Sequence, residues 1–142
     1  LDVITMAVKV PQTLAHLHYW SVWMPRKASK DEVLDAFCAS SRIALIRMSD
    51  GLGAINAVKE MMADLGRPND SLYEVALWSN ILAVDGTELC YNYMVDNQAI
   101  VIPETIDAIR APSGNVRDGA DSIAKTDKTL GIGELPRQVA RR

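Results

Sequence analysis

The residues best suited to chemistry are His16 and His18, the two histidines of a chain of 142 residues. They flank Leu17 within segment 14–24, whose aromatic and aliphatic residues predict a strand. Side chains two positions apart in a strand project from the same face, and the residues between them project from the other. We therefore expect the two imidazoles to lie side by side, on the face that also carries Trp20.

Three interpretations of this pair remain open from the local sequence. A metal site needs at least a third ligand, which would have to be a carboxylate or a thiolate, since the chain has no further histidine. A structural role would pack the imidazoles against Trp20 and hydrogen-bond them to the backbone. A general base needs a group that titrates near neutral pH, and imidazole is the natural candidate.

The two cysteines, Cys38 and Cys90, are expected to be structural. A nucleophilic thiol needs a lowered pKa in a polar, accessible setting. Cys38 instead lies on the apolar stripe of a predicted helix, and Cys90 lies within a predicted hairpin strand. With no CxxC pair and no signal peptide, they predict neither a disulfide scaffold nor a zinc site, and they suit a reducing cytoplasm.

Two further features could contact a ligand. The polar run from Asp96 through Asn97 to Gln98 interrupts a series of apolar strands. An amide there could bind a ligand's carboxamide, but the residues alone favour the end of a turn. Gly51 and Gly53 form only Gly-x-Gly, which indicates an ordinary turn before a helix and not a phosphate-binding loop.

Length and composition indicate one ordinary soluble domain. The chain is 49% hydrophobic and 23% charged, and a domain typically has about 100–200 residues. Apolar runs such as 43–46 are far shorter than the roughly 18 residues of a membrane span. Fifteen basic against 18 acidic residues give a net charge of −3, which disfavours nucleic acid as a partner.

The elements that must position the histidines follow from periodicity and turn signals. The helix from Lys30 to Ala39 begins with a capping box, Ser29 and Glu32, and the hairpin is expected to turn at Asp85-Gly86. The other predicted elements are strands at 3–10, 14–24, 42–48, 72–79, 81–84 and 88–95, and helices at 54–65, from Pro103 to about 111, and at 118–126. This order indicates an α+β fold: a mixed, largely antiparallel sheet with helices on one face, and no Rossmann unit.

Several segments together closely resemble one family. They are 2–11 (DVITMAVKVP), 13–18 (TLAHLH), 72–78 (LYEVALW), 100–111 (IVIPETIDAIRA) and 122–132 (SIAKTDKTLGI). This pattern is similar to the archaeal, type II glyceraldehyde-3-phosphate dehydrogenases, and the match spans nearly the whole chain. The resemblance implies the C-terminal part of a longer enzyme. Residues 1–102 would be an N-terminally truncated catalytic domain, and 103–142 a helical segment packing on a nucleotide-binding domain that this chain lacks.

The resemblance also implies roles for particular residues. The essential histidine of the family falls on His16, which would act as the general base, with His18 as its neighbour. The nicotinamide contact falls on Asn97, with Gln98 as the alternative, where the family more usually has His-Gln-Glu. The glycine-rich loop, the nucleophilic cysteine and the histidines that help to hold the substrate phosphate are expected upstream of Leu1.

The implied activity is the oxidation of D-glyceraldehyde 3-phosphate with NAD or NADP and inorganic phosphate to 1,3-bisphosphoglycerate, in glycolysis or gluconeogenesis. The implied assembly is a cytoplasmic homotetramer when full length, and this chain alone is expected to be inactive. Two alternatives stay open: a stand-alone binding or oligomerisation domain without catalysis, and a small metal-dependent hydrolase. Four cations could bind the substrate phosphate, and the sequence does not choose among them: Arg26, Lys27, Arg42 and Arg47.

Overall fold

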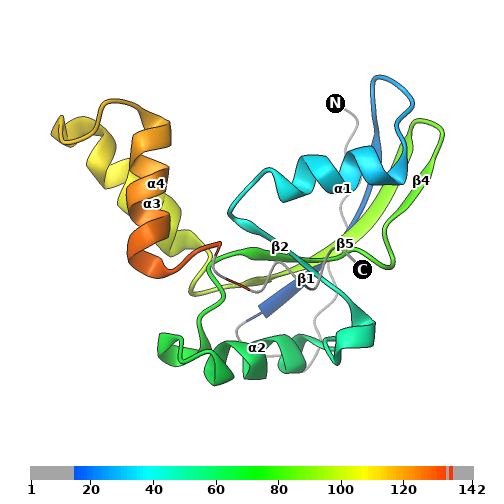
Figure 1. The fold of residues 1–142 in the computed structure, drawn as a ribbon, viewed down its shortest axis with the longest axis horizontal. Coiled ribbons are helices and arrows are strands. Elements are labelled where there is room, and N and C mark those ends of the chain that lie inside the picture. The colour runs from blue at the N-terminus through cyan, green and yellow to red at the C-terminus, as the bar shows by residue number, and fades with distance from the viewer. Residues whose placement is uncertain (1–14, 134, 136–142) are drawn as a thin grey trace.

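The computed structural model describes residues 15–133 and 135 (Figure 1). The predicted strand at 3–10 lies outside the described residues. The strands are β1 (Ala15–Trp23), β2 (Ile43–Ile46), β3 (Val75–Trp78), β4 (Ala83–Asp85) and β5 (Glu88–Asp96). The helices are α1 (Lys30–Cys38), α2 (Ile55–Asp64), α3 (Val101–Arg110) and α4 (Gly119–Leu130), with short 3₁₀ turns at Met48–Asp50, Pro68–Asp70 and Ala111–Ser113.

The strands form one mixed sheet in the order β1-β5-β3-β2, with β4 paired to β5. The long β1–β5 pair is antiparallel, from Ala15 opposite Asp96 to Trp23 opposite Glu88. The β3–β5 and β4–β5 pairs are also antiparallel, and only β2–β3 is parallel among the described strands. The α+β class and the mixed, largely antiparallel sheet are therefore confirmed.

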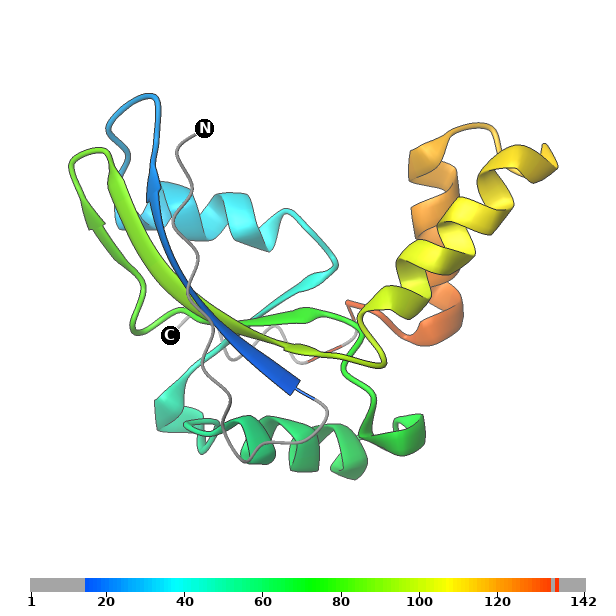
Figure 2. The same ribbon diagram turned by 180° about the vertical axis from the view of Figure 1, so that it is seen from behind.

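The helices cover both faces of this sheet and not one, so that part of the expectation is wrong (Figures 1 and 2). Ala76 and Trp78 of β3 pack in one apolar cluster with Val58 of α2. Leu77, the residue between them, packs in another cluster with Val33 of α1. Because β3 is apolar on both faces, each face needs its own covering helix to exclude water.

Local signals correctly predicted the start of α1 and the end of α2. The Ser29 hydroxyl accepts a hydrogen bond from the backbone N–H of Glu32 at 3.1 Å, and the Glu32 carboxylate accepts one from the backbone N–H of Ser29 at 2.8 Å. These two bonds complete the predicted capping box of α1. Helix α2 ends at Asp64, just before Gly66, which has a φ of +72° that suits glycine.

The hairpin turn lies one residue later than expected. Asp85 pairs with Glu88, so the two turn residues are Gly86 and Thr87. Gly86 has a φ of +61°, and Thr87 is not among the residues with positive φ. A positive φ at the first turn residue alone is the pattern of a type II′ turn, which explains why glycine occupies that position.

Helix α3 begins before Pro103, the residue where it was expected to start. The helix runs from Val101, and a turn over residues 97–100 connects it to β5. Helix α4 extends beyond the predicted 118–126 to Leu130, and the Asp118 side chain caps it by accepting from the backbone N–H of Asp121. The proposed division between residues 102 and 103 thus falls in the first turn of α3.

Candidate functional site

The two histidines lie on the face of β1 that is turned toward α1. His16 is exposed and His18 is half-buried. Their rings meet edge to face, with centroids 6.0 Å apart and planes at 66°. The shared face is therefore confirmed, and His16 is accessible to a substrate.

The pairing of β1 with β5 gives His18 an aromatic neighbour. His18 lies directly opposite Tyr93, and the two rings stack with centroids 4.9 Å apart and planes at 11°. The structural interpretation expected Trp20 to support the imidazoles, whereas the ring that stacks on His18 is Tyr93. Its position could not be found from the sequence, because the register between two strands some 70 residues apart is set by tertiary structure.

Asn97 and Gln98 lie at the same end of the sheet as His16. His16 pairs with Val95, and the two amide residues follow the last residue of β5, Asp96. Both are exposed, so their side chains are accessible to a ligand. The fold thus brings the predicted base and the predicted amide contact to one edge; whether they bind one substrate and cofactor stays a prediction.

Asp96 fixes the backbone beside the amide residues. Its carboxylate is buried and accepts hydrogen bonds from the backbone N–H groups of Gln98 and Ala99, at 3.0 and 3.1 Å. It also forms an ion pair with Lys59 of α2. Burial alone would raise the pKa of Asp96, but the bonds from Lys59, Ala99 and Gln98 outweigh burial and lower the pKa below its ordinary value.

The sequence offered a local signal for this role of Asp96. Aspartate often accepts hydrogen bonds from backbone N–H groups two or three residues further on, and this favours a turn. The Lys59 partner had no local signal, because it belongs to a helix more than 30 residues earlier.

The two cysteines lie in different surroundings. Cys90 is opposite Ser21, five residues along β1 from His16, or roughly 17 Å at the rise of a strand. Both Ser21 and Cys90 project from the face opposite the histidines, because strand neighbours alternate. Cys38 packs against the apolar cluster under α1. The half-buried position of Cys38 agrees with the expected structural role, whereas Cys90 is exposed and its role stays a prediction.

Most of the candidate phosphate-binding cations already have carboxylate partners. Arg26 pairs with Glu32, and Arg47 pairs with Asp50. Lys27 lies beyond the end of β1 that is far from His16. The structure therefore does not single out a phosphate-binding cation beside His16.

Arg42, the fourth cation, joins the sheet to helices α3 and α4. It precedes β2 and forms ion pairs with Glu104 and Asp107 of α3 and with Asp127 of α4. Burial alone would lower the pKa of Arg42, but hydrogen bonds to Asp107, Glu104 and Asp127 raise it above its ordinary value. Because three carboxylates hold the guanidinium, we assign Arg42 a structural role.

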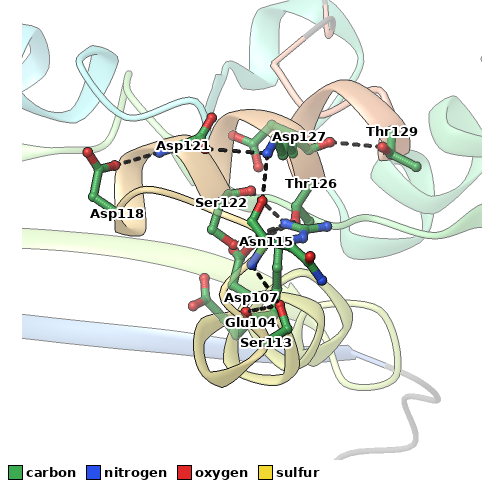
Figure 3. A network of polar contacts seen from close by, with 12 residues as sticks. Glu104, Asp107, Ser113, Asn115, Asp118, Asp121, Ser122, Thr126, Asp127 and Thr129 are labelled. Atoms are coloured by element: carbon green, nitrogen blue, oxygen red, sulfur yellow. Dashed lines mark hydrogen bonds and ion pairs between the residues drawn. The ribbon is translucent and has the colours of Figure 1, made fainter.

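A polar network also holds α3 and α4 together (Figure 3). The Asp107 carboxylate accepts hydrogen bonds from the hydroxyls of Ser122 and Thr126, both at 2.7 Å. Arg110 donates to the same two hydroxyls, at 3.0 and 2.7 Å. A cavity of about 460 Å³ lies beside this network, and none of its lining residues belongs to β1 or β5. The cavity is therefore distinct from the histidine surface.

The described residues hold neither a candidate metal cluster nor a candidate membrane-spanning helix. Across residues 15–133 and 135, no group of three or more His, Cys, Asp or Glu side chains is placed to hold a metal ion. Within the same part of the chain, no helix has both the length and the apolar character needed to cross a bilayer.

Comparisons with known proteins give a consistent result. The chain is 40% identical over 132 residues to a glyceraldehyde-3-phosphate dehydrogenase of Methanobrevibacter smithii, covering 93% of this chain and 39% of the relative. The identity is 37% over 134 residues with that of Metallosphaera sedula, and 42% over 130 residues with that of Pyrobaculum calidifontis. These alignments cover 94% and 92% of this chain and 39% and 38% of the relatives. No family model matches the chain.

Proposed function

This chain is related over nearly its whole length to archaeal glyceraldehyde-3-phosphate dehydrogenases, of which it spans about two fifths, and we propose that it forms part of such an enzyme. The proposed reaction is the oxidation of D-glyceraldehyde 3-phosphate with NAD or NADP and phosphate to 1,3-bisphosphoglycerate. The observation that carries the proposal is the exposed His16 at the sheet edge where Asn97 and Gln98 follow β5.

His16 is the proposed general base. When a thiol adds to the aldehyde, the adduct carries a hydroxyl group, and its proton must leave as the carbon is oxidised. An exposed imidazole can approach that hydroxyl oxygen and take the proton. We propose that the thiol comes from a part of the protein outside this chain, because Cys90 projects from the opposite face and Cys38 packs in the apolar cluster under α1.

The amide residues are the proposed cofactor contact. The exposed side chains of Asn97 and Gln98 can each donate and accept a hydrogen bond, which is the complement of a carboxamide. These residues therefore fit a nicotinamide ring, which would accept the hydride. We propose Asn97 as the contact and Gln98 as its alternative, and the residue that binds would orient the ring toward the substrate.

The α3–α4 pair offers apolar surface that another domain could cover. Val101, Ile109 and Ile123 are large apolar side chains that remain exposed there, at 55%, 70% and 42%. Exposed apolar residues gathered on two helices are typical of a surface that packs against another domain. We propose that residues 103–142 pack on the nucleotide-binding domain, and that the complete protein is a cytoplasmic homotetramer.

The test replaces His16 by alanine in the complete protein that contains this chain. We expect the turnover number to fall by about 10²- to 10⁴-fold, the usual contribution of a general base. Thermal unfolding should change little, because His16 is exposed. An Asn97→Ala variant should mainly raise the KM for the cofactor. Near-normal turnover in His16→Ala would exclude this mechanism.

One observation favours a second candidate. Cys90 projects from the face opposite the histidines and Cys38 packs in the apolar cluster under α1, as expected of a binding or oligomerisation domain with a dehydrogenase-like fold and no catalysis. Steady-state assays of the complete protein decide between the two. Reduction of NAD or NADP that depends on both the aldehyde and phosphate supports the enzyme, whereas its absence supports the binding domain. The 142-residue chain alone should show no such activity.

A further inference from the structure

A row of aromatic rings extends from the helix α1 to the exposed His16. Phe37 of α1 contacts Tyr91 of β5, with centroids 5.4 Å apart. Tyr91 stacks on Tyr93 at 6.1 Å, and Tyr93 stacks on His18 at 4.9 Å. The last contact in the row is the edge-to-face pair of His18 and His16.

This row supplies support that β1 alone does not give. Among the described strands, β1 pairs only with β5. His16 is exposed on β1 and therefore has few neighbours among the described residues to fix its rotamer. The nearly parallel stack of His18 on Tyr93 limits rotation of His18, and the His18 ring in turn borders His16.

We propose that Tyr93 is a positioning residue for His16, and that it acts through the stacked ring of His18. This inference rests on the proposed function, in which His16 is the base. Tyr93 would not touch the substrate; its ring holds His18, and His18 restricts His16 to orientations from which it can reach the substrate hydroxyl. The ring surface of Tyr93 provides the support, because stacking requires the π face and not the hydroxyl.

The first test is a set of three variants of the complete protein. In Tyr93→Leu the apolar side chain remains but the ring is lost, and we expect the turnover number to fall by about 2- to 10-fold with the KM values unchanged. Tyr93→Phe retains the ring and should keep normal turnover. Tyr19→Leu is the matched control, since it makes the same change on the opposite face of β1.

A spectroscopic readout tests the stack independently of activity. A ring stacked on Tyr93 experiences its ring current, so the His18 ring proton should resonate upfield in the native protein. Histidine ring ¹³C labelling of the complete protein gives this signal, and its loss in a His18→Gln variant assigns it. The upfield displacement should persist in Tyr93→Phe and Tyr19→Leu and disappear in Tyr93→Leu.

Several outcomes would overturn the inference. An unchanged His18 signal in Tyr93→Leu would show that the stack does not form, and unchanged turnover would show that it does not support the base. Loss of turnover in Tyr93→Phe would assign the effect to the hydroxyl. Normal turnover in His16→Ala would instead remove the proposed function, and the positioning role with it, even if the His18 signal behaves as expected.

Discussion

Asp96 is the residue whose replacement tests most directly how the sheet edge is held together. Its carboxylate caps the turn after β5 through two backbone N–H groups and pairs with Lys59. A lost N-cap costs about 1 kcal/mol. A lost charge-assisted hydrogen bond at a buried site costs about 1.5–3 kcal/mol. We therefore expect Asp96→Ala to lower the free energy of unfolding by about 3 kcal/mol.

A second substitution at the same position separates the two contributions. Asparagine accepts the same local backbone hydrogen bonds in turns as aspartate does, so Asp96→Asn should keep the two backbone contacts. The variant should lose only the negative charge that faces Lys59. The expected loss is about 2 kcal/mol. Lys59 also donates to the backbone carbonyl of Asp70 at 2.6 Å, so it keeps one partner in both variants.

Urea unfolding followed by tryptophan fluorescence measures these losses. Trp78 is a suitable probe, since it is buried and its indole N–H donates to the backbone carbonyl of Leu52 at 2.7 Å. A double-mutant cycle with Asp96→Asn and Lys59→Met should give a coupling energy of about 1 kcal/mol or more. A coupling energy near zero would refute the ion pair, and an equal loss in both Asp96 variants would refute the cap.

The same contacts predict how stability depends on pH. The pKa of Asp96 is lower in the folded chain than in the unfolded chain, so the unfolded state binds its proton first as the pH falls. The stabilisation is fully present above the unfolded pKa, and it is lost progressively as the pH falls through the folded pKa. The wild-type chain should therefore lose its advantage over Asp96→Asn in this acidic range, whereas a difference that does not change with pH would contradict the assignment.

Two further substitutions test the buried ion pair near β3 and the hairpin. Arg67→Ala should cost about 3–5 kcal/mol of unfolding free energy, because Arg67 holds the fully buried Glu74 carboxylate at 2.6 and 2.7 Å and its removal leaves a buried charge without its cation. Urea unfolding measures this loss. A loss below about 1 kcal/mol would show that Arg67 is not the main partner of the Glu74 carboxylate. Gly86→Ala should cost about 1–2 kcal/mol, because the turn requires a φ of +61° that alanine disfavours. Gly119→Ala is its matched control, since Gly119 has open space around its α-carbon and no positive φ, and equal melting temperatures for the two variants would contradict the assigned turn.

Features set by neighbouring residues could be read from the sequence. The capping box of Ser29 and Glu32 defines the start of α1 wherever that helix packs, because both of its hydrogen bonds are local. The common face of His16 and His18 follows from the two-residue period of any strand. The order of the predicted strands and helices likewise indicated the α+β class. The role of His16 as a base did not follow from periodicity, because it was implied by the family resemblance.

Features set by contacts between distant segments required the tertiary structure. The stack of Tyr93 on His18 depends on the register of β1 with β5, and a shift of one residue would turn Tyr93 to the other face. The cations Arg42 and Lys59 are engaged by carboxylates far away in the sequence, which no local pattern shows. The covering of both sheet faces likewise depends on strand order. Local periodicity therefore determined which residues share a face, and only the packing of distant segments decided what each face meets.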